Sequence, residues 1–238
     1  MSENVIIALD VATHQEVSSL LTKIDRKQLY VKVGMELYYQ EGPELIKALK
    51  NQGHDIFLDL KLHDIPTTVY KAMKGLAKLD VDMVNVHAAG GQKMMRAALE
   101  GLDEGTPSGK TRPLCIAVTQ LTSTDQALLE NDILIHQPLE QVILTYGRKT
   151  FEAGLDGVVC SPLEAGKVKE YISKDFLAVT PGIRLKGDDS NDQKRVTTPK
   201  QARMLGSDYI VVGRSVTQAP EPSAAYSRVL EEWRNDHE

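Results

Sequence analysis

The sequence predicts an α/β protein built as a single (β/α)8 barrel, the TIM-barrel architecture, with residues 1–238 forming one domain. Short apolar runs rich in β-branched residues recur along the whole chain, and a helical pattern follows each of them. The runs are nearly continuous in apolar character, which is typical of parallel strands covered on both faces. The length of 238 residues is close to the ~250 of a typical barrel, and no break in composition divides the chain.

Eight strands are expected to alternate with helices. The predicted strands are, in chain order, 5–10, 30–35, 55–61, 83–88, 114–119, 157–161, 177–180 and 209–214. Capping boxes, which satisfy the first free amides of a helix, are predicted at Thr13 with Glu16, Ser161 with Glu164, and Thr198 with Gln201. Gly206 suits the end of the helix that Thr198 begins. An open doubly wound sheet would instead need a glycine-rich first turn, but the residues after Asp10 read VATH.

Bulk composition argues against several functional classes. The formal charge is −5 without a basic block, whereas nucleic-acid binding needs clustered Lys and Arg. No apolar stretch approaches the ~20 residues that span a bilayer, and the first residues, MSENVIIALD, do not resemble a signal peptide. Cys115 and Cys160 lie in apolar runs without metal-ligand spacing, so buried, reduced thiols are expected. These features predict a cytoplasmic protein that binds neither nucleic acid nor membrane.

Charged residues lie at several predicted strand ends, where the active sites of barrels are found. Asp10 ends the first strand, Lys32 lies within the second, and Asp59 and Lys61 lie within the third. Partly buried charges cost desolvation energy and persist mainly where they are paired or functional. An isolated ion pair would have the same spacing, but charges on three neighbouring strands favour a functional cluster.

Strand periodicity predicts that Asp59 and Lys61 share one face. If the leucines at 58, 60 and 62 face the helices, both charged side chains point into the barrel mouth. They would then lie ~4 Å apart and attract each other by roughly 4 kcal/mol at an effective dielectric constant near 20. Together with Asp64, just beyond the strand, they form the expected reaction centre.

Two other kinds of site use similar residues. A divalent metal could bind Asp10, Asp59 or His87, but the ammonium of Lys61 among them would repel it, so no metal is expected. His87 alone is more typical of a hydrogen-bonded core residue, and His63 of an exposed loop. Schiff-base chemistry would require a neutral amine, whereas flanking carboxylates favour an ammonium. Lys61 is therefore predicted to act as a general acid.

The end of the last predicted strand suggests a phosphate site. In barrels, phosphate commonly binds at the loops after strands seven and eight, near a helix N-terminus. Gly213 would let the backbone approach the ligand closely, and Arg214 would supply two parallel hydrogen bonds.

Two loops suggest further ligand contacts. Residues 180–196 are far more than the ~2–6 usual for such a connection, so the segment is either a disordered surface loop or, preferably, a lid. In a lid, Arg184 and Gln193 would close on an anionic ligand, with Gly187 supplying flexibility. Residues 120–123 offer hydroxyl and amide groups that could bind a polar ring.

Taken together, these segments resemble the orotidine 5′-phosphate decarboxylase family in its bacterial form. The matching segments are IALD at 7–10, VKVGMEL at 31–37, DLKLHDIPTTV at 59–69, VTQLTS at 118–123, TPGIR at 180–184 and VVGRS at 211–215. They cover essentially the full chain in order, and the D-x-K-x-x-D-I-P run is the most specific. The resemblance implies a carboxy-lyase of pyrimidine biosynthesis that converts orotidine 5′-monophosphate to uridine 5′-monophosphate (UMP) and CO₂ without a cofactor.

The resemblance also implies roles at the reacting end of the substrate. Asp59 would lie beside the substrate carboxylate, and Lys61 would deliver the proton to pyrimidine C6. Asp10 and Lys32 would hold the ribose hydroxyls.

Further roles follow for the remaining matching residues. Asp64 and Thr68 would reach across a homodimer interface into the partner's site. Thr122 would contact the pyrimidine, and Pro181 would shape the root of the lid. The residues implied to bind the phosphate are Arg184, Gln193, Gly213 and Arg214.

Two alternatives remain at this point. One is a magnesium-dependent sugar-phosphate decarboxylase or aldolase of the same barrel superfamily. The other is a catalytically silent barrel that binds nucleotides. The long loop and Thr122 favour a nucleotide over a short sugar, and the intact charge cluster favours catalysis.

Overall fold

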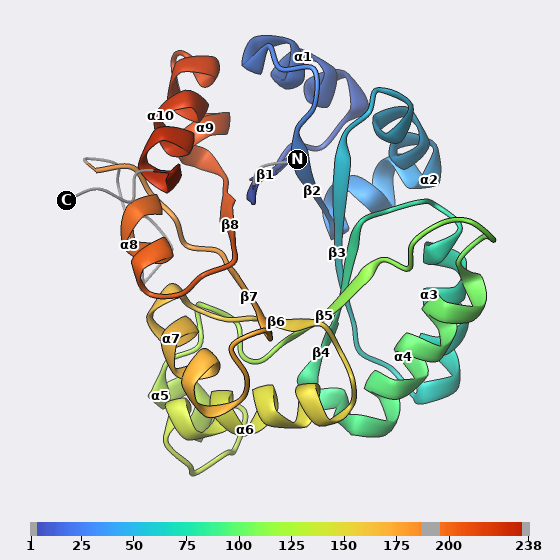
Figure 1. The fold of residues 1–238 in the computed structure, drawn as a ribbon, viewed down its shortest axis with the longest axis vertical. Helices are drawn as coiled ribbons and strands as arrows, with labels where there is room; N and C mark the ends of the chain where they lie inside the picture. The colour runs from blue at the N-terminus through green and yellow to red at the C-terminus, as the bar shows by residue number, and fades with distance from the viewer. Residues whose placement is uncertain (1–3, 187–195, 235–238) are drawn as a thin grey trace.

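The computed structural model describes residues 4–186 and 196–234 of the chain. Eight strands form a closed barrel, each pairing in parallel with its neighbours in sequence, and β8 closes the ring onto β1 (Figure 1). The strands are β1 (Val5–Ala8), β2 (Tyr30–Gly34), β3 (Asp55–Leu62), β4 (Met83–His87), β5 (Leu114–Val118), β6 (Gly157–Val159), β7 (Leu177–Thr180) and β8 (Tyr209–Val212). The predicted (β/α)8 barrel is confirmed.

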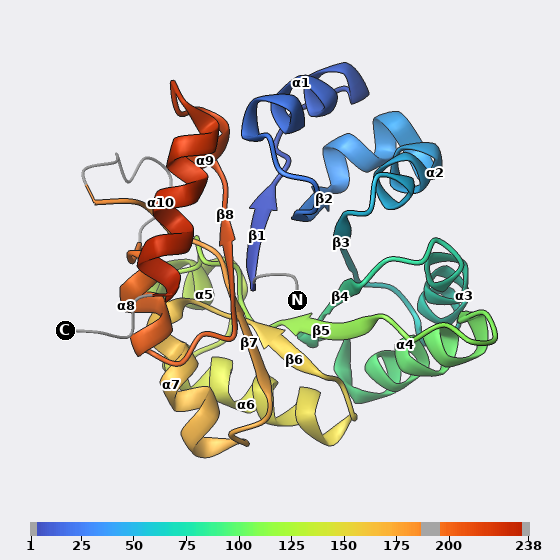
Figure 2. The same cartoon turned by 45° about the horizontal axis from the view of Figure 1, so that its top comes forward.

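Helices form an outer ring around the strands (Figure 1). They are α1 (His14–Ile24), α2 (Met35–Asn51), α3 (Pro66–Ala77), η1 (Ala88–Gly90, a 3₁₀ turn), α4 (Gly91–Gly105), α5 (Gln126–Asn131), α6 (Leu139–Glu152), α7 (Pro162–Tyr171), α8 (Pro199–Met204), α9 (Arg214–Thr217) and α10 (Pro222–Arg234). Helix α10, red in Figure 2, contacts both α8 and α1, so it completes the ring beside the first helix. None of the described helices has the length and apolar character needed to cross a membrane.

Alternating strand residues build two layers of core. One set packs against helix residues such as Val17 and Leu20, and it forms the layer between barrel and helices. The other set contains only strand residues and fills the barrel interior: Ile6, Ala8, Tyr30, Phe57, Met83, Ile116, Val179 and Val211. This inner layer lies below the mouth of the barrel, where the charged residues Lys32 of β2 and Asp59 and Lys61 of β3 are found.

The predicted helix starts are confirmed, whereas several predicted strands extend too far. All three capping boxes form with both reciprocal hydrogen bonds, and Gly206 follows α8 with a φ of +95°. However, β1 ends at Ala8 and β8 at Val212, two residues before the predicted ends at Asp10 and Arg214. These two residues leave the ladder to enter the loops above the barrel, and Arg214 is already the first residue of α9.

The root of the long loop after β7 is held by a short backbone bridge between Ile183 and Thr197. The Arg184 amide donates to the Thr197 carbonyl at 3.0 Å, and the Thr197 amide donates to the Gly182 carbonyl at 3.2 Å. The predicted lid residues Gly187 and Gln193 lie outside the described residues.

Candidate active site

A buried carboxylate and two ammonium groups form the centre of the site. Lys61 Nζ lies 2.7 Å from Asp59 Oδ1, and Lys32 Nζ lies 3.2 Å from Asp59 Oδ2. Lys32 also lies 3.6 Å from Asp10 Oδ1 and so links the two carboxylates. Strands β1, β2 and β3 therefore bring four of the predicted residues into one charge network at the barrel mouth.

The ionisation of Asp59 is set by two opposing effects. Burial alone would raise its pKa, because only 9% of its side chain is exposed. Lys32 and Lys61 oppose this effect, and hydrogen bonds from Lys61 and Asn85 add to them, so the pKa lies below its ordinary value. Asp59 is therefore a carboxylate at neutral pH, held between two cations.

Strand β3 is irregular where it carries this pair. Leu58 pairs with Val84 and Leu62 with Val86, so the three residues from Asp59 to Lys61 lie opposite a single residue of β4. Lys61 has a φ of +50°, in the left-handed region that non-glycine residues seldom adopt. The expected pairing of Asp59 and Lys61 is observed, but a β-bulge produces it rather than a regular alternation.

A cavity of about 270 Å³ opens beside the charge network. Its lining residues come from the ends of β1, β2, β7 and β8, from α9, and from the residue after α9: Ala8, Asp10, Lys32, Pro181, Gly182, Arg184, Val211, Gly213, Arg214, Thr217 and Gln218. Six of the predicted site residues are among them. Lys32 joins this cavity to Asp59, so the two parts form one continuous site.

Gly213 lets the chain pass close to Asp10. A Cβ atom at this position would lie 3.3 Å from Asp10 Oδ2 and 3.8 Å from the Ala8 side chain. Its carbonyl accepts hydrogen bonds from the amides of Val216 and Thr217, which begins the short helix α9. A larger residue at 213 would therefore crowd the carboxylate that Lys32 holds.

Three predicted residues lie away from this cavity. Asp64 and Thr68 are exposed around the start of α3, where Asp64 Oδ1 accepts a hydrogen bond from the Ile65 amide at 2.6 Å. Thr122 is half-buried in the turn after β5. The structure therefore separates these residues from the cavity.

Two histidines lie next to the charge network. The rings of His63 and His87 have centroids 5.6 Å apart. Burial lowers the pKa of half-buried His87, and the neighbouring His63 and Lys61 lower it further. His87 is therefore neutral at pH 7 and adds no charge beside Lys61. Within the described part of the chain, no group of three His, Cys, Asp or Glu side chains is arranged to hold a metal ion.

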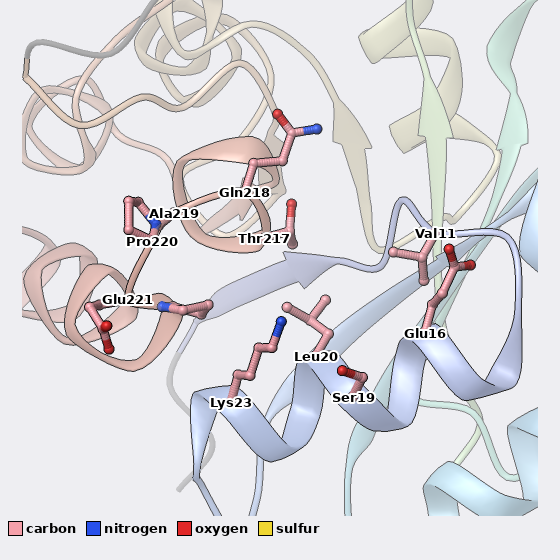
Figure 3. Close-up of a pocket in the computed structure, with 11 residues that line it drawn as sticks. Val11, Glu16, Ser19, Leu20, Lys23, Thr217, Gln218, Ala219, Pro220 and Glu221 are labelled. Atoms are coloured by element: carbon pink, nitrogen blue, oxygen red, sulfur yellow. The ribbon is translucent and has the colours of Figure 1, made fainter.

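A larger cavity of about 710 Å³, whose lining residues are drawn in Figure 3, shares two of these residues with the first. Its walls are α1 and the segment from Thr217 to Pro222, and Thr217 and Gln218 line both cavities. The charged side chains around it are Glu16, Lys23 and Glu221, and a Glu16 oxygen already accepts the capping hydrogen bond from the Thr13 amide. None of the site residues predicted from the sequence lines this cavity, so the smaller cavity beside the charge network is the candidate site.

Nearly the whole barrel matches a known family. A model of the orotidine 5′-phosphate decarboxylase / HUMPS family matches residues 3–229. The chain belongs to this family. Among curated members, the orotidine 5′-phosphate decarboxylase of Bacillus cereus strain B4264 is 59% identical over 233 residues, which is 98% of each chain.

Solved structures related to this decarboxylase family have the same fold. The orotidine 5′-phosphate decarboxylase of Lactobacillus acidophilus is 44% identical, with a TM-score of 0.87 over 97% of this chain and 99% of that one. An uncharacterized conserved protein from Geobacillus kaustophilus is 54% identical, with a TM-score of 0.87 over 97% of this chain and 100% of that one.

Sequence reasoning missed three polar side chains that the geometry adds to the site. Thr217 and Gln218 line the cavity from α9 and the residue after it. Asn85 contacts both Asp59 and the backbone of Lys61. Asn85 carried one available signal, because it is a single amide within the otherwise apolar start of the run MVNVH.

Proposed function

We propose that the chain converts orotidine 5′-monophosphate to UMP and CO₂ and that Lys61 and Asp59 carry the reaction. The observation that supports this most directly is the 2.7 Å pair between Lys61 Nζ and Asp59 Oδ1, at the barrel mouth beside a cavity bordered by cations. The names of the curated relatives point to the same reaction.

Lys61 supplies the positive charge and the proton. When the bond between C6 and the carboxylate breaks, CO₂ leaves and the electron pair stays on C6 as a localised carbanion. The ammonium of Lys61 stabilises this charge and then transfers a proton to C6, which yields UMP. Because the charge comes from the protein itself, this step requires no cofactor.

Asp59 holds Lys61 in place and lies beside the departing carboxylate. Its two oxygens are bound by Lys61 and Lys32, so the ammonium of Lys61 is oriented before substrate binds. The same negative charge repels the substrate carboxylate, and this repulsion is relieved when neutral CO₂ forms.

The cavity binds the remainder of the nucleotide. Arg184, Arg214 and the backbone at Gly213 bind the phosphate, and Asp10 and Lys32 bind the ribose hydroxyls. Further proposed contacts come from Pro181 at the cavity wall, from Thr122 to the pyrimidine, and from Gln193, which lies outside the described residues. Phosphate contacts far from C6 contribute binding energy that raises the rate at C6.

A decarboxylation assay tests this proposal. Chelator-treated protein is mixed with orotidine 5′-monophosphate, and loss of the substrate's ultraviolet absorbance is followed. Turnover without added metal is expected. Turnover of a sugar phosphate that requires magnesium would instead indicate a sugar-phosphate decarboxylase or aldolase of the same barrel superfamily. UMP binding without turnover would indicate a silent nucleotide-binding barrel.

We also propose a homodimer with shared active sites, in which Asp64 and Thr68 enter the partner's site. Support comes from the segment around the start of α3, where Asp64 and Thr68 are exposed and Ile65 keeps 67% of its surface accessible.

Mixing two inactive variants tests the shared sites. A hybrid of Lys61→Ala and Asp64→Ala subunits contains one intact site, so equal mixing should restore about a quarter of wild-type activity. Mixing Lys61→Ala with the double variant Lys61→Ala/Asp64→Ala is the matched control, because no hybrid site is then intact. The absence of any gain over this control would refute shared sites.

We further propose that the whole chain acts as one catalytic domain in the cytoplasm. Support for this location comes from Cys115 and Cys160, which are buried and form no disulfide. Burial raises the pKa of the Cys115 thiol to about 12, so it remains protonated and unreactive at neutral pH.

A further inference from the structure

Asn85 lies on β4, opposite the bulge that carries Asp59 and Lys61, and only 1% of it is exposed. Its Oδ1 accepts a hydrogen bond from the Lys61 amide at 2.7 Å, and its Nδ2 donates to Asp59 Oδ1 at 2.7 Å. One side chain therefore binds the backbone of the proposed acid and the side chain of its partner.

The chemistry of its partners fixes the orientation of this amide. The Lys61 backbone amide can only donate a hydrogen bond, and an ionised Asp59 can only accept one. Oδ1 must therefore face Lys61 and Nδ2 must face Asp59. Neither aspartate, with two acceptor oxygens, nor an aliphatic residue of similar size can make both contacts at neutral pH.

The bulge explains why this amide is needed. With three residues of β3 opposite Asn85 alone, the ladder offers no regular backbone acceptor for the Lys61 amide. The Asn85 side chain takes the place of that acceptor and holds Lys61 at its φ of +50°. A buried amide without such a partner would favour a shift of the strand toward regular pairing.

We propose that Asn85 is a positioning residue for the decarboxylation, which holds Lys61 and Asp59 in their reactive arrangement without contacting substrate. This inference rests on the proposed function. Only 1% of Asn85 is exposed, and its side-chain hydrogen bonds go to Lys61 and Asp59. Its loss should therefore lower kcat while KM stays near its wild-type value.

The first test compares Asn85→Ala with the wild-type enzyme. Loss of a residue that orients reacting groups typically costs 10–100-fold in activity, so kcat is expected to fall by about 10–100-fold. Thr150→Ala is the matched control, because Thr150 is also fully buried and hydrogen-bonded but lies on α6. That control should lower thermal stability and leave kcat unchanged.

The pH dependence of kcat in Asn85→Asp gives a second test, because a purely structural role of Asn85 would not change it. The introduced carboxyl can donate to Asp59 only while it is protonated, and burial beside a carboxylate raises its pKa. The titratable groups near it are Asp59, Lys61, Lys32 and His87, and its β5 neighbour Ile116 is apolar. Relative to wild type, kcat of this variant should rise as the pH falls and decrease as the carboxyl ionises.

The outcomes separate this inference from the function on which it rests. If the wild-type protein does not decarboxylate orotidine 5′-monophosphate, the proposed function fails. If the wild type is active, the inference is overturned by wild-type kcat in Asn85→Ala. It is also overturned by a pH profile of Asn85→Asp that parallels the wild-type profile, a result that is available even if Asn85→Ala does not fold.

Discussion

The two halves of the candidate site differ in how far the protein's own side chains bind and bury their charged groups. At the ends of β2, β3 and β4, Asp59 is bound by three donors, and only 9% of its side chain is exposed. At the ends of β1, β7 and β8, the cavity is open, and the side chain of Asp10 is 60% exposed. The proposed reacting groups are therefore fixed in advance, whereas the proposed nucleotide end is an open cavity bordered by cations.

This difference indicates a division of labour. Preorganised charges accelerate a reaction because they need no rearrangement as the transition state forms. An open cavity bordered by Lys32, Arg184 and Arg214 instead gains most of its interaction energy when an anion enters. Variants of the first half should therefore change kcat, and variants of the second half should mainly change KM.

The largest effect is expected from Lys61→Ala. Removal of the proposed proton donor, whose charge would also stabilise the carbanion, should lower kcat by at least about 10⁴-fold. Binding of UMP, measured by calorimetry, should be largely retained, because the cavity is unchanged.

The matched control for this variant is Lys47→Ala. Lys47 is an exposed lysine of α2 that pairs with Glu44, and its loss should leave kcat unchanged. A loss of UMP binding in Lys61→Ala as large as the loss of kcat would contradict the division between the two halves.

An intermediate effect is expected from Arg214→Ala. Loss of one proposed charged partner of the phosphate should raise KM by about 100-fold, with a smaller decrease in kcat. Steady-state kinetics measures both constants, and Arg228→Ala, an exposed arginine of α10, serves as the control. A decrease in kcat at unchanged KM would show that this end of the site is not primarily a binding region.

The smallest effect concerns stability in acid. Because the pKa of Asp59 is lower in the folded state than its ordinary 3.8, its contribution to folding is complete above that value. The contribution is lost as the pH falls through the folded-state pKa, with a slope of at most about 1.4 kcal/mol per pH unit. In urea titrations, Asp59→Asn should show a shallower acid dependence than wild type; equal slopes would mean that Asp59 is not stabilised by its cations.

Much of the fold could be predicted because its signals are local. The apolar runs are long enough to identify all eight strands, and each capping box depends on residues only three positions apart. The ends of β1 and β8 were harder to predict. Asp10 and Arg214 follow the apolar runs closely in sequence, although both lie outside the strands. Their positions depend on the loops that carry them over the barrel.

The site was only partly predictable for a related reason. Asp59 and Lys61 stand out as charges in an apolar strand, so sequence identifies them without knowledge of the bulge between β3 and β4. The role of Asn85 depends on pairing between two strands, which no spacing within one strand reveals. Asp64 and Thr68 came from family resemblance, because a single chain carries no pattern that identifies a partner's surface.

The bulge has a consequence for protein engineering. Because the Asp-x-Lys tripeptide takes its geometry from the residue opposite it, copying these three positions into another barrel would reproduce the charges without their arrangement. The smallest segment that keeps this geometry is a pair of adjacent strands, in which β3 carries the bulged residues 59–61 and β4 carries Asn85. A designer who transfers the reaction to a new scaffold should therefore graft β3 and β4 together.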